Sequence, residues 1–267
     1  MNDIVKAVIL GIVEGVTEFL PVSSTGHLIL VNQYISFSER FTKMFDIVIQ
    51  LGAILSVIVF FRSRILPFGK KSLVERDKIF DIWKKTIMGV IPALFIGALF
   101  KKQIEELLFN PVTVAVALVI GGIALILLEG RKTCDKIQTI ENLNYKTSFL
   151  IGLIQCLAMI PGTSRSGATI IGAMLLGCSR IVAVEFSFYL AIPTIAAASA
   201  YSFLKAGMVL SSSELVSLSV GFIVSFLVAW IVIAGFMNFI SKRDFKLFGY
   251  YRIILGGIVI LSFLTKR

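Results

Sequence analysis

The stretch EGVTEFLPVSSTGH (Glu14–His27) decides the fold class, because it interrupts an apolar segment that runs from about residue 4 to residue 35. Pro21 has no N–H to donate and disfavours a helical conformation in the residue before it, so we expect a first half-helix to end there. The Ser-Ser-Thr run that follows supplies strong N-cap residues, and we expect a second half-helix to start there with His27 in its first turn. The stretch therefore predicts a hairpin of two half-helices.

A second interruption has the same character. The apolar stretch 148–179 contains PGTSRSG at 161–167, which is again a proline followed by hydroxyl residues and glycines. When Gly11–Gly26 is laid over Gly152–Gly167 without gaps, the two interruptions coincide. The overlay pairs Glu14 with Gln155, Ser23 with Ser164, Ser24 with Arg165, and Gly26 with Gly167. We therefore expect an internal repeat.

The repeat predicts a topology. Each half, about 1–130 and about 145–267, would hold one re-entrant helix pair and three membrane-spanning helices, and each ends in a helix with a Gly-Gly pair. An odd number of crossings turns the second copy upside down, which gives an inverted-topology repeat. The tips of the two re-entrant pairs should then meet near the middle of the membrane.

The whole chain has the composition of a membrane protein. Of its 267 residues, 57% are hydrophobic and only 16% are charged, and the mean hydropathy is +0.92, whereas soluble domains carry about 25% charged residues. A membrane helix needs about 20 mostly apolar residues. Six segments are candidates, namely 46–61, 86–100, 112–128, 184–204, 215–240 and 249–264. We predict an all-α polytopic membrane protein in which residues 1–267 form a single integral membrane domain.

The formal net charge of +10 does not indicate nucleic-acid binding. The lysines and arginines lie in short loops between apolar segments, chiefly in 62–85, 131–146 and 242–246. Short loops rich in Lys and Arg stay in the cytoplasm. We therefore expect these loops to be cytoplasmic and both termini to lie outside.

Three charged residues in the interrupted stretches require an explanation. A charge in mid-membrane costs about 2.5–3.5 kcal/mol on insertion scales, so Glu14, Glu18 and Arg165 should face a polar cavity or one another. Glu14 and Glu18 are four residues apart and share one helix face. Two close carboxylates share a proton or a cation, and oxygen ligands favour Mg²⁺ or Ca²⁺ over zinc. The alternative is a structural salt bridge between the interruptions.

The other residues of the interruptions suit an anion. Helix N-termini present free N–H groups and a positive dipole end, and a guanidinium binds phosphate oxygens with two prongs. The candidates are Ser23, Ser24, Thr25, Gly26 and His27 in the first interruption and Thr163, Ser164, Arg165, Ser166 and Gly167 in the second. Helix capping alone would explain the hydroxyl residues, and a lone histidine is commonly an ordinary polar side chain, but neither explains the arginine. Together the residues indicate phosphoryl transfer from a membrane-dissolved phosphate ester.

These motifs resemble those of the undecaprenyl-pyrophosphate phosphatase family, the bacitracin-resistance proteins of bacterial membranes. The family's signatures are an (E/Q)-x-x-x-E motif that runs into Pro-x-Ser-Ser-Thr-Gly-His, and a Pro-Gly-x-Ser-Arg-Ser-x-x-Thr motif. Here they read EGVTEFLPVSSTGH (Glu14–His27) and PGTSRSGAT (Pro161–Thr169), complete and in order. The apolar layout matches the family over essentially the whole chain.

The resemblance implies hydrolysis of undecaprenyl pyrophosphate to undecaprenyl phosphate, which recycles the lipid carrier of cell-wall synthesis and confers resistance to bacitracin, a competitor for the same lipid. It implies a homodimer in the bacterial plasma (inner) membrane with an active site open to the outer face. The implied roles are Ser24 as nucleophile, Arg165 as pyrophosphate clamp, Glu14 and Glu18 as metal or acid–base carboxylates, and His27 as proton-transfer partner. The implied phosphate-binding set is Ser23, Thr25, Gly26, Thr163, Ser164, Arg165, Ser166, Gly167 and Thr169.

Two questions stay open at this level. The base that activates Ser24 is His27, Glu18 or a metal-bound hydroxide, unless water attacks directly. Inverted repeats with broken helices are also the architecture of secondary transporters, so a flippase of the lipid phosphate is the competing function. The hydroxyl, imidazole and guanidinium groups together favour the hydrolase. A purely structural scaffold would leave the three charges unexplained.

Overall fold

The computed structural model describes residues 1–131, 136–206 and 210–264. Within these residues the fold is helical, apart from an isolated β-bridge between Ile137 and Cys178. The helices are α1 (Asp3–Thr17), α2 (Ser24–Val31), α3 (Glu39–Phe60), α4 (Arg62–Ile65), α5 (Leu73–Leu108), α6 (Pro111–Glu129), η1 (Ile140–Asn142), α7 (Tyr145–Gln155), η2 (Cys156–Met159), α8 (Arg165–Leu175), α9 (Arg180–Ala206), α10 (Ser212–Ile240) and α11 (Lys246–Leu264).

Six helices are long and apolar enough to cross a membrane, namely α3, α5, α6, α9, α10 and α11. They confirm the all-α polytopic architecture, and each corresponds to one predicted segment. Every one of them begins earlier than predicted, most of all α5, which starts at Leu73 and not near residue 86. The reason is that hydropathy marks only the apolar part of a helix, whereas the charged first turns of α5 continue the same helix beyond it.

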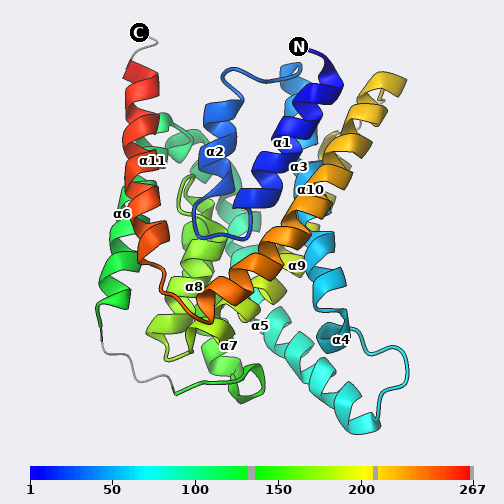
Figure 1. Cartoon of the computed structure of the whole chain (residues 1–267), viewed down its shortest axis with the longest axis vertical. Coiled ribbons are helices and arrows are strands. Elements are labelled where there is room, and N and C mark those ends of the chain that lie inside the picture. The colour runs from blue at the N-terminus through cyan, green and yellow to red at the C-terminus, as the bar shows by residue number, and fades with distance from the viewer. Residues whose placement is uncertain (132–135, 207–209, 265–267) are drawn as a thin grey trace.

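Two helix pairs do not span the fold but turn back near its middle, as predicted. The first is α1 and α2, and the second is α7 with η2 and α8 (Figure 1). The end of α1 was predicted wrongly, because the helix stops at Thr17 and not at Pro21. A proline ring clashes with the carbonyl group four residues before it. For Pro21 that carbonyl belongs to Thr17, which explains where the helix ends.

The two halves of the chain interlock. Helix α1 packs along α10, α7 packs along α5, and α6 packs along α11. The re-entrant helix of each half therefore lies on a spanning helix of the other half. Both contacts need glycine: a Cβ added to Gly11 would lie 2.8 Å from the carbonyl oxygen of Gly221, and one added to Gly152 would lie 1.9 Å from that of Gly89. The repeats at about 1–130 and 145–267 and their inverted topology stay predictions.

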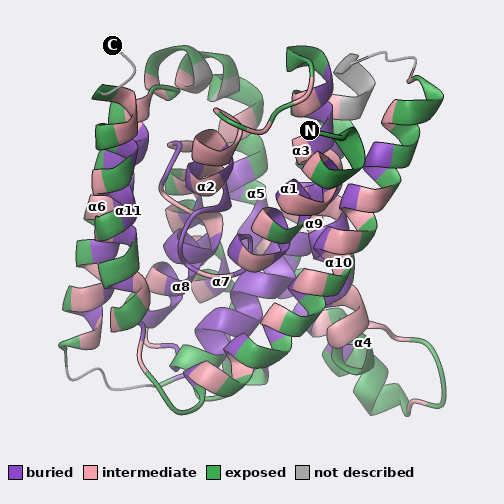
Figure 2. Ribbon diagram, turned by 45° about the horizontal axis from the view of Figure 1, so that its top comes forward, coloured by how far each residue is buried: buried purple, intermediate pink, exposed green. Residues whose placement is uncertain are grey.

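The start of α1 and the end of α11 lie at one end of the molecule, and the segments around α4 and between α10 and α11 lie at the opposite end (Figure 1). Helix α9 is the central spanning helix, with 67% of its apolar window buried, whereas only 28% of the α11 window is buried. The outward faces of the peripheral helices are exposed in Figure 2 and carry large apolar side chains, among them Ile120, Leu127, Ile231, Ile254 and Leu261. Such a surface is suited to lipid contact.

Candidate active site

The first break (residues 18–23) and the second break (residues 160–164) share one backbone design. Ser23 and Ser164 have φ angles of 73° and 70°, and they are the only non-glycine residues with positive φ in the described part of the chain. Each caps the helix that follows, because its Oγ accepts a hydrogen bond from a glycine N–H three residues later, at 3.2 Å from Gly26 and 3.1 Å from Gly167. Strained backbone of this kind persists where the surroundings enforce it, and it clusters at active sites.

The two breaks touch each other. Arg165 Nη2 lies 3.0 Å from Glu18 Oε1, which makes an ion pair between residues 147 positions apart. Ser166 Oγ donates a hydrogen bond of 2.8 Å to the carbonyl oxygen of Leu20. The tips of the re-entrant pairs therefore meet, and their position at the middle of the membrane stays a prediction. The structural salt bridge considered as an alternative is present as well, so its existence alone does not separate a structural role from a chemical one.

Glu18 holds the hydroxyl of Ser24. Ser24 Oγ donates to Glu18 Oε2 at 2.6 Å, while the other carboxylate oxygen of Glu18 receives Arg165. Both Ser24 and Glu18 are buried, with 8% of each residue exposed. Of the three bases left open by the sequence, Glu18 is the one that the geometry places on the serine hydroxyl. A carboxylate at this distance can accept the hydroxyl proton as the oxygen attacks.

His27 is oriented away from this pair by two hydrogen bonds. Its Nδ1 lies 2.7 Å from the carbonyl oxygen of Ser23, which only accepts, so Nδ1 carries the proton. Its Nε2 lies 2.6 Å from the hydroxyl of Tyr251, which therefore donates to it when the imidazole is neutral. The two rings stack at 5.6 Å with an interplanar angle of 8°. The expected contact between His27 and Ser24 is not among these bonds.

Glu14 is fully buried, and neither of its carboxylate oxygens has a hydrogen-bond partner among the described residues. Its counterpart in the repeat, Gln155, is also buried with both amide atoms unpartnered. The described residues contain no group of three or more His, Cys, Asp or Glu side chains that could hold a metal. Mg²⁺, however, commonly binds one or two carboxylates and completes its shell with water and substrate phosphates. The free oxygens of Glu14 beside Glu18 fit that mode.

The remaining predicted residues divide into two groups. The hydroxyls of Ser166 and Thr169 are taken up by protein groups, since Thr169 Oγ1 lies 2.7 Å from Ser187 Oγ and 2.9 Å from the carbonyl oxygen of Arg165. Thr25 and Thr163 are half-buried at the two breaks. The Nε of Arg165 is buried without a partner in the described structure. This nitrogen is a free donor for an anion.

Sequence reasoning missed three residues that surround these groups. Arg165 Nη1 donates to the carbonyl oxygen of Ser187 at 2.9 Å, Tyr251 bonds His27, and the adjacent Arg252 reaches both breaks. Ser187 and Tyr251 carry no signal in the sequence, because serines and tyrosines are ordinary in membrane helices. Arg252 did carry one, since it is a charge within the predicted span 249–264.

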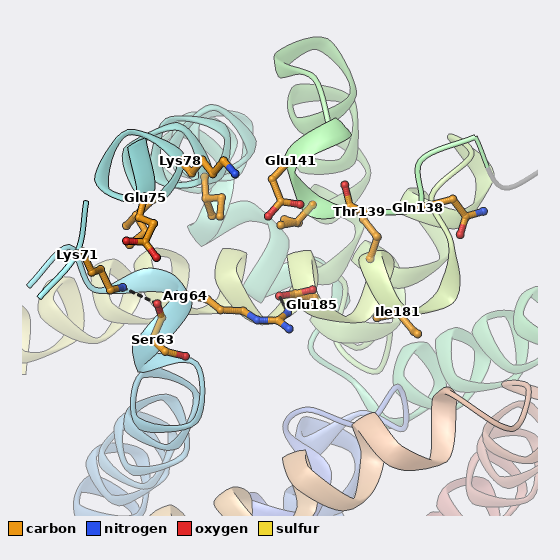
Figure 3. A pocket seen from close by; sticks show the side chains of 14 residues that line it. Ser63, Arg64, Lys71, Glu75, Lys78, Gln138, Thr139, Glu141, Ile181 and Glu185 are labelled. Atoms are coloured by element: carbon orange, nitrogen blue, oxygen red, sulfur yellow. Dashed lines mark hydrogen bonds and ion pairs between the residues drawn. The ribbon is translucent and has the colours of Figure 1, made fainter. Parts of the chain in front are cut away.

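A separate cleft of about 490 Å³ opens at the end of the molecule away from the termini, between α4, α5, η1 and α9 (Figure 3). Its wall holds the ion pair of Arg64 with Glu185, with 2.7 Å between Nη1 and Oε1, and Glu185 also accepts from the Tyr189 hydroxyl at 2.6 Å. None of the residues of the two motifs lines it. The candidate chemistry is therefore located at the breaks and not in this cleft.

Comparisons with known proteins agree with this assignment. The family model described as Bacitracin resistance protein BacA matches residues 7–258. The chain is 48% identical to an undecaprenyl-diphosphatase of Acetivibrio thermocellus, with 100% of both chains covered. It is 52% identical to undecaprenyl-diphosphatase 1 of Clostridioides difficile, over 98% of this chain and 96% of that one. An undecaprenyl-diphosphatase of Fusobacterium nucleatum is 52% identical over 95% of this chain and 98% of its own. The chain belongs to the bacitracin-resistance protein family.

Proposed function

We propose that this chain is a membrane phosphatase that hydrolyses undecaprenyl pyrophosphate to undecaprenyl phosphate and phosphate. The activity recycles the lipid carrier of cell-wall synthesis and confers resistance to bacitracin. The relatives that match over the full length bear the name undecaprenyl-diphosphatase. The observation that supports the reaction most directly is the Ser24 hydroxyl at 2.6 Å from Glu18, with Arg165 on the other oxygen of the same carboxylate.

In the proposed mechanism Ser24 Oγ attacks the terminal phosphorus, and its proton passes to Glu18. The bond between that phosphorus and the bridging oxygen breaks, undecaprenyl phosphate leaves with the proton that Glu18 had taken up, and phosphoserine remains. Water then attacks the phosphoserine, Glu18 accepts a proton from that water and passes it to Ser24 Oγ, and phosphate departs with the Ser24 hydroxyl restored. Arg165 and the N–H groups that begin α2 and α8 hold the phosphate oxygens as negative charge develops. His27 takes up and releases a proton at Nε2, and the Tyr251 hydroxyl, which is hydrogen-bonded to Nε2, assists this transfer.

Glu14 and Glu18 are the residues that would hold a divalent cation, Mg²⁺ or Ca²⁺. Such an ion neutralises pyrophosphate oxygens and so favours attack by an anionic nucleophile. The support is the pair of unpartnered, buried oxygens on Glu14. In this proposal Glu18 also accepts the Ser24 proton, whereas Glu14 has no role besides holding the ion.

Phosphate release from a polyprenyl pyrophosphate by the purified protein in detergent tests the function. We expect steady release that an excess of chelator abolishes and that added Mg²⁺ or Ca²⁺ restores. Full activity in chelator would remove the metal from the proposal and leave two carboxylates that share a proton. An absence of release with and without metal, from monodisperse protein, would remove the phosphatase itself.

We further propose a homodimer in the bacterial plasma membrane, with the basic loops in the cytoplasm and with both termini and the active-site opening on the outer face. The lipid would also be the ligand for which bacitracin competes. Single-cysteine variants test the sidedness on a background without native cysteines. A membrane-impermeant thiol reagent added to intact cells should label Ser38→Cys and spare Ser72→Cys. Labelling of position 72 alone would invert the orientation. Chemical cross-linking in native membranes tests the dimer.

A further inference from the structure

Arg252 is the largest fully buried side chain of the described structure, and it lies within the membrane-spanning helix α11. No carboxylate pairs with it among residues 1–131, 136–206 and 210–264. Instead its guanidinium donates to five backbone carbonyl oxygens. A buried charge without an anion is costly unless dipoles compensate it. The positions of the five carbonyl groups that compensate its charge therefore indicate the role of Arg252.

The five carbonyl oxygens come from three separate segments. Arg252 Nη1 reaches the oxygen of Pro21 in the first break at 3.2 Å. Its Nη2 reaches the oxygens of Gly162 and Thr163 in the second break at 3.1 and 2.9 Å. The other two bonds, of 3.1 Å and 3.3 Å, go to Ala117 and Leu118 of α6. One side chain thus joins both breaks to a third helix.

We propose that Arg252 is a positioning residue that fastens the two breaks to each other and to α6, so that Ser24 and Arg165 face one substrate. This inference rests on the proposed phosphatase function. Catalysis needs the nucleophile and the clamp on the same pyrophosphate, yet they sit on separate re-entrant pairs. The Glu18–Arg165 ion pair cannot hold the pairs together through the reaction, because both partners must take up substrate or a proton. Arg252 bonds only backbone and is free to stay in place.

The Gly-Gly pair of α6 makes room for this arrangement. A Cβ added to Gly121 would lie 2.2 Å from Arg252 Nη2, closer than any side chain tolerates. A Cβ added to Gly257, in the corresponding pair of α11, would meet nothing within 4 Å. The two glycines therefore provide a matched test. Alanine at 121 displaces the guanidinium without removing its charge, whereas alanine at 257 leaves it untouched.

The experiment compares Arg252→Lys, Gly121→Ala and Gly257→Ala in the phosphate-release assay. An ammonium cannot span five acceptors in three segments, and a misplacement of about 1 Å costs on the order of 100-fold in rate. We expect kcat to fall about 100-fold for Arg252→Lys and about tenfold for Gly121→Ala, with KM within about threefold of the parent. Gly257→Ala should match the parent. A folded Arg252→Lys protein with parental kcat would overturn the proposal.

Thermal unfolding provides a readout that does not depend on activity. If Arg252 fastens the breaks, its loss should couple to the loss of the ion pair that also joins them. We expect the Tm changes of Arg252→Lys and Glu18→Gln to be non-additive in the double variant, and those of Gly257→Ala and Glu18→Gln to add. Additive changes in both pairs would overturn the proposal. An inactive parent with the expected coupling would refute the phosphatase function and leave the fastening role intact. If Arg252→Lys does not fold, Gly121→Ala decides: parental kcat there would also overturn the proposal.

Discussion

The two breaks have the same backbone and different chemistry. In both, a serine with positive φ caps a helix through a glycine N–H three residues later. The residue that follows this serine is Ser24 in the first case and Arg165 in the second. In the helix before the break, the aligned buried residue is Glu14 in the first case and Gln155 in the second. The first break thus brings a hydroxyl and carboxylates, and the second brings a guanidinium cation.

This difference teaches that one backbone design can carry different side chains, so that each break contributes different chemical groups to their contact. Under the proposed mechanism, a symmetric pair would lack either the nucleophile or the clamp. The ion pair between Glu18 and Arg165 at 3.0 Å marks the point where the two unlike breaks meet. Four substitutions test whether the two breaks have different roles.

The largest effect is expected from Ser24→Ala, which removes the group that has no counterpart in the second break. Loss of a catalytic nucleophile can cost on the order of 10⁶ in kcat. We expect phosphate release to fall at least about 10⁴-fold, measured with purified protein at saturating lipid. Ser241→Ala, which changes the exposed C-cap serine of α10, is the control and should retain full activity. Near-normal turnover by Ser24→Ala would assign the attack to water.

Glu18→Gln should come next. The amide keeps the shape but cannot accept the Ser24 proton, and general-base catalysis contributes about 10²–10⁴-fold. We expect kcat to fall within that range while the protein stays monodisperse. Glu39→Gln, an exposed carboxyl at the start of α3, should leave kcat unchanged. An active Glu18→Gln variant would return His27 or a metal-bound hydroxide to the role of base.

Glu14→Gln makes the first break resemble the second, because Gln155 occupies the aligned position. If Glu14 holds a cation, the variant should need about 10–100-fold more Mg²⁺ or Ca²⁺ for half-maximal rate. The reciprocal control is Gln155→Ala, which should leave the metal requirement unchanged. An equal shift in both variants would contradict a division of labour between the two positions.

Tyr251→Phe should have the smallest effect. It removes one hydrogen bond to His27 Nε2, which is worth about 1 kcal/mol, and we expect kcat to fall about fivefold. Tyr250→Phe removes a hydroxyl from the neighbouring residue on α11 and should leave kcat unchanged. If both variants behave alike, the imidazole does not depend on Tyr251.

The sequence was sufficient for the parts of the fold that hydropathy and proline dictate. The six spans and the two breaks are local features, and the residues that the breaks bring together were predicted from their motifs. The length of α5 was not predicted, because its charged first turns carry no apolar signal. Ser187, Tyr251 and Arg252 were missed for another reason. They join the site from α9 and α11, where the packing of those helices against α8, α2 and α6 brings them. Of the three, only Arg252 carried a signal in the sequence, as a charge within a predicted span.

The choice of base was beyond the sequence as well. Ser24 lies three residues from His27 and six from Glu18, so spacing alone favours the imidazole. In the fold, the turn at residues 18–23 brings Glu18 back onto Ser24, while Ser23 and Tyr251 turn the imidazole elsewhere. A local carbonyl oxygen at Ser23 and a hydroxyl donor in a distant helix, Tyr251, therefore decide between two nearby candidates.

The interlocked packing of α1 on α10 also sets an order of events during biosynthesis. Thr17 ends α1 and Ser212 begins α10, so at about 5–20 residues per second the ribosome needs on the order of 10–40 s to supply the partner. For all of that time the hairpin of α1 and α2, which carries Glu14 and Glu18, lacks the helix along which α1 packs in the finished protein. We therefore expect it to wait at the membrane surface and to insert only after α10 has emerged, which makes assembly of the active site one of the last steps of folding.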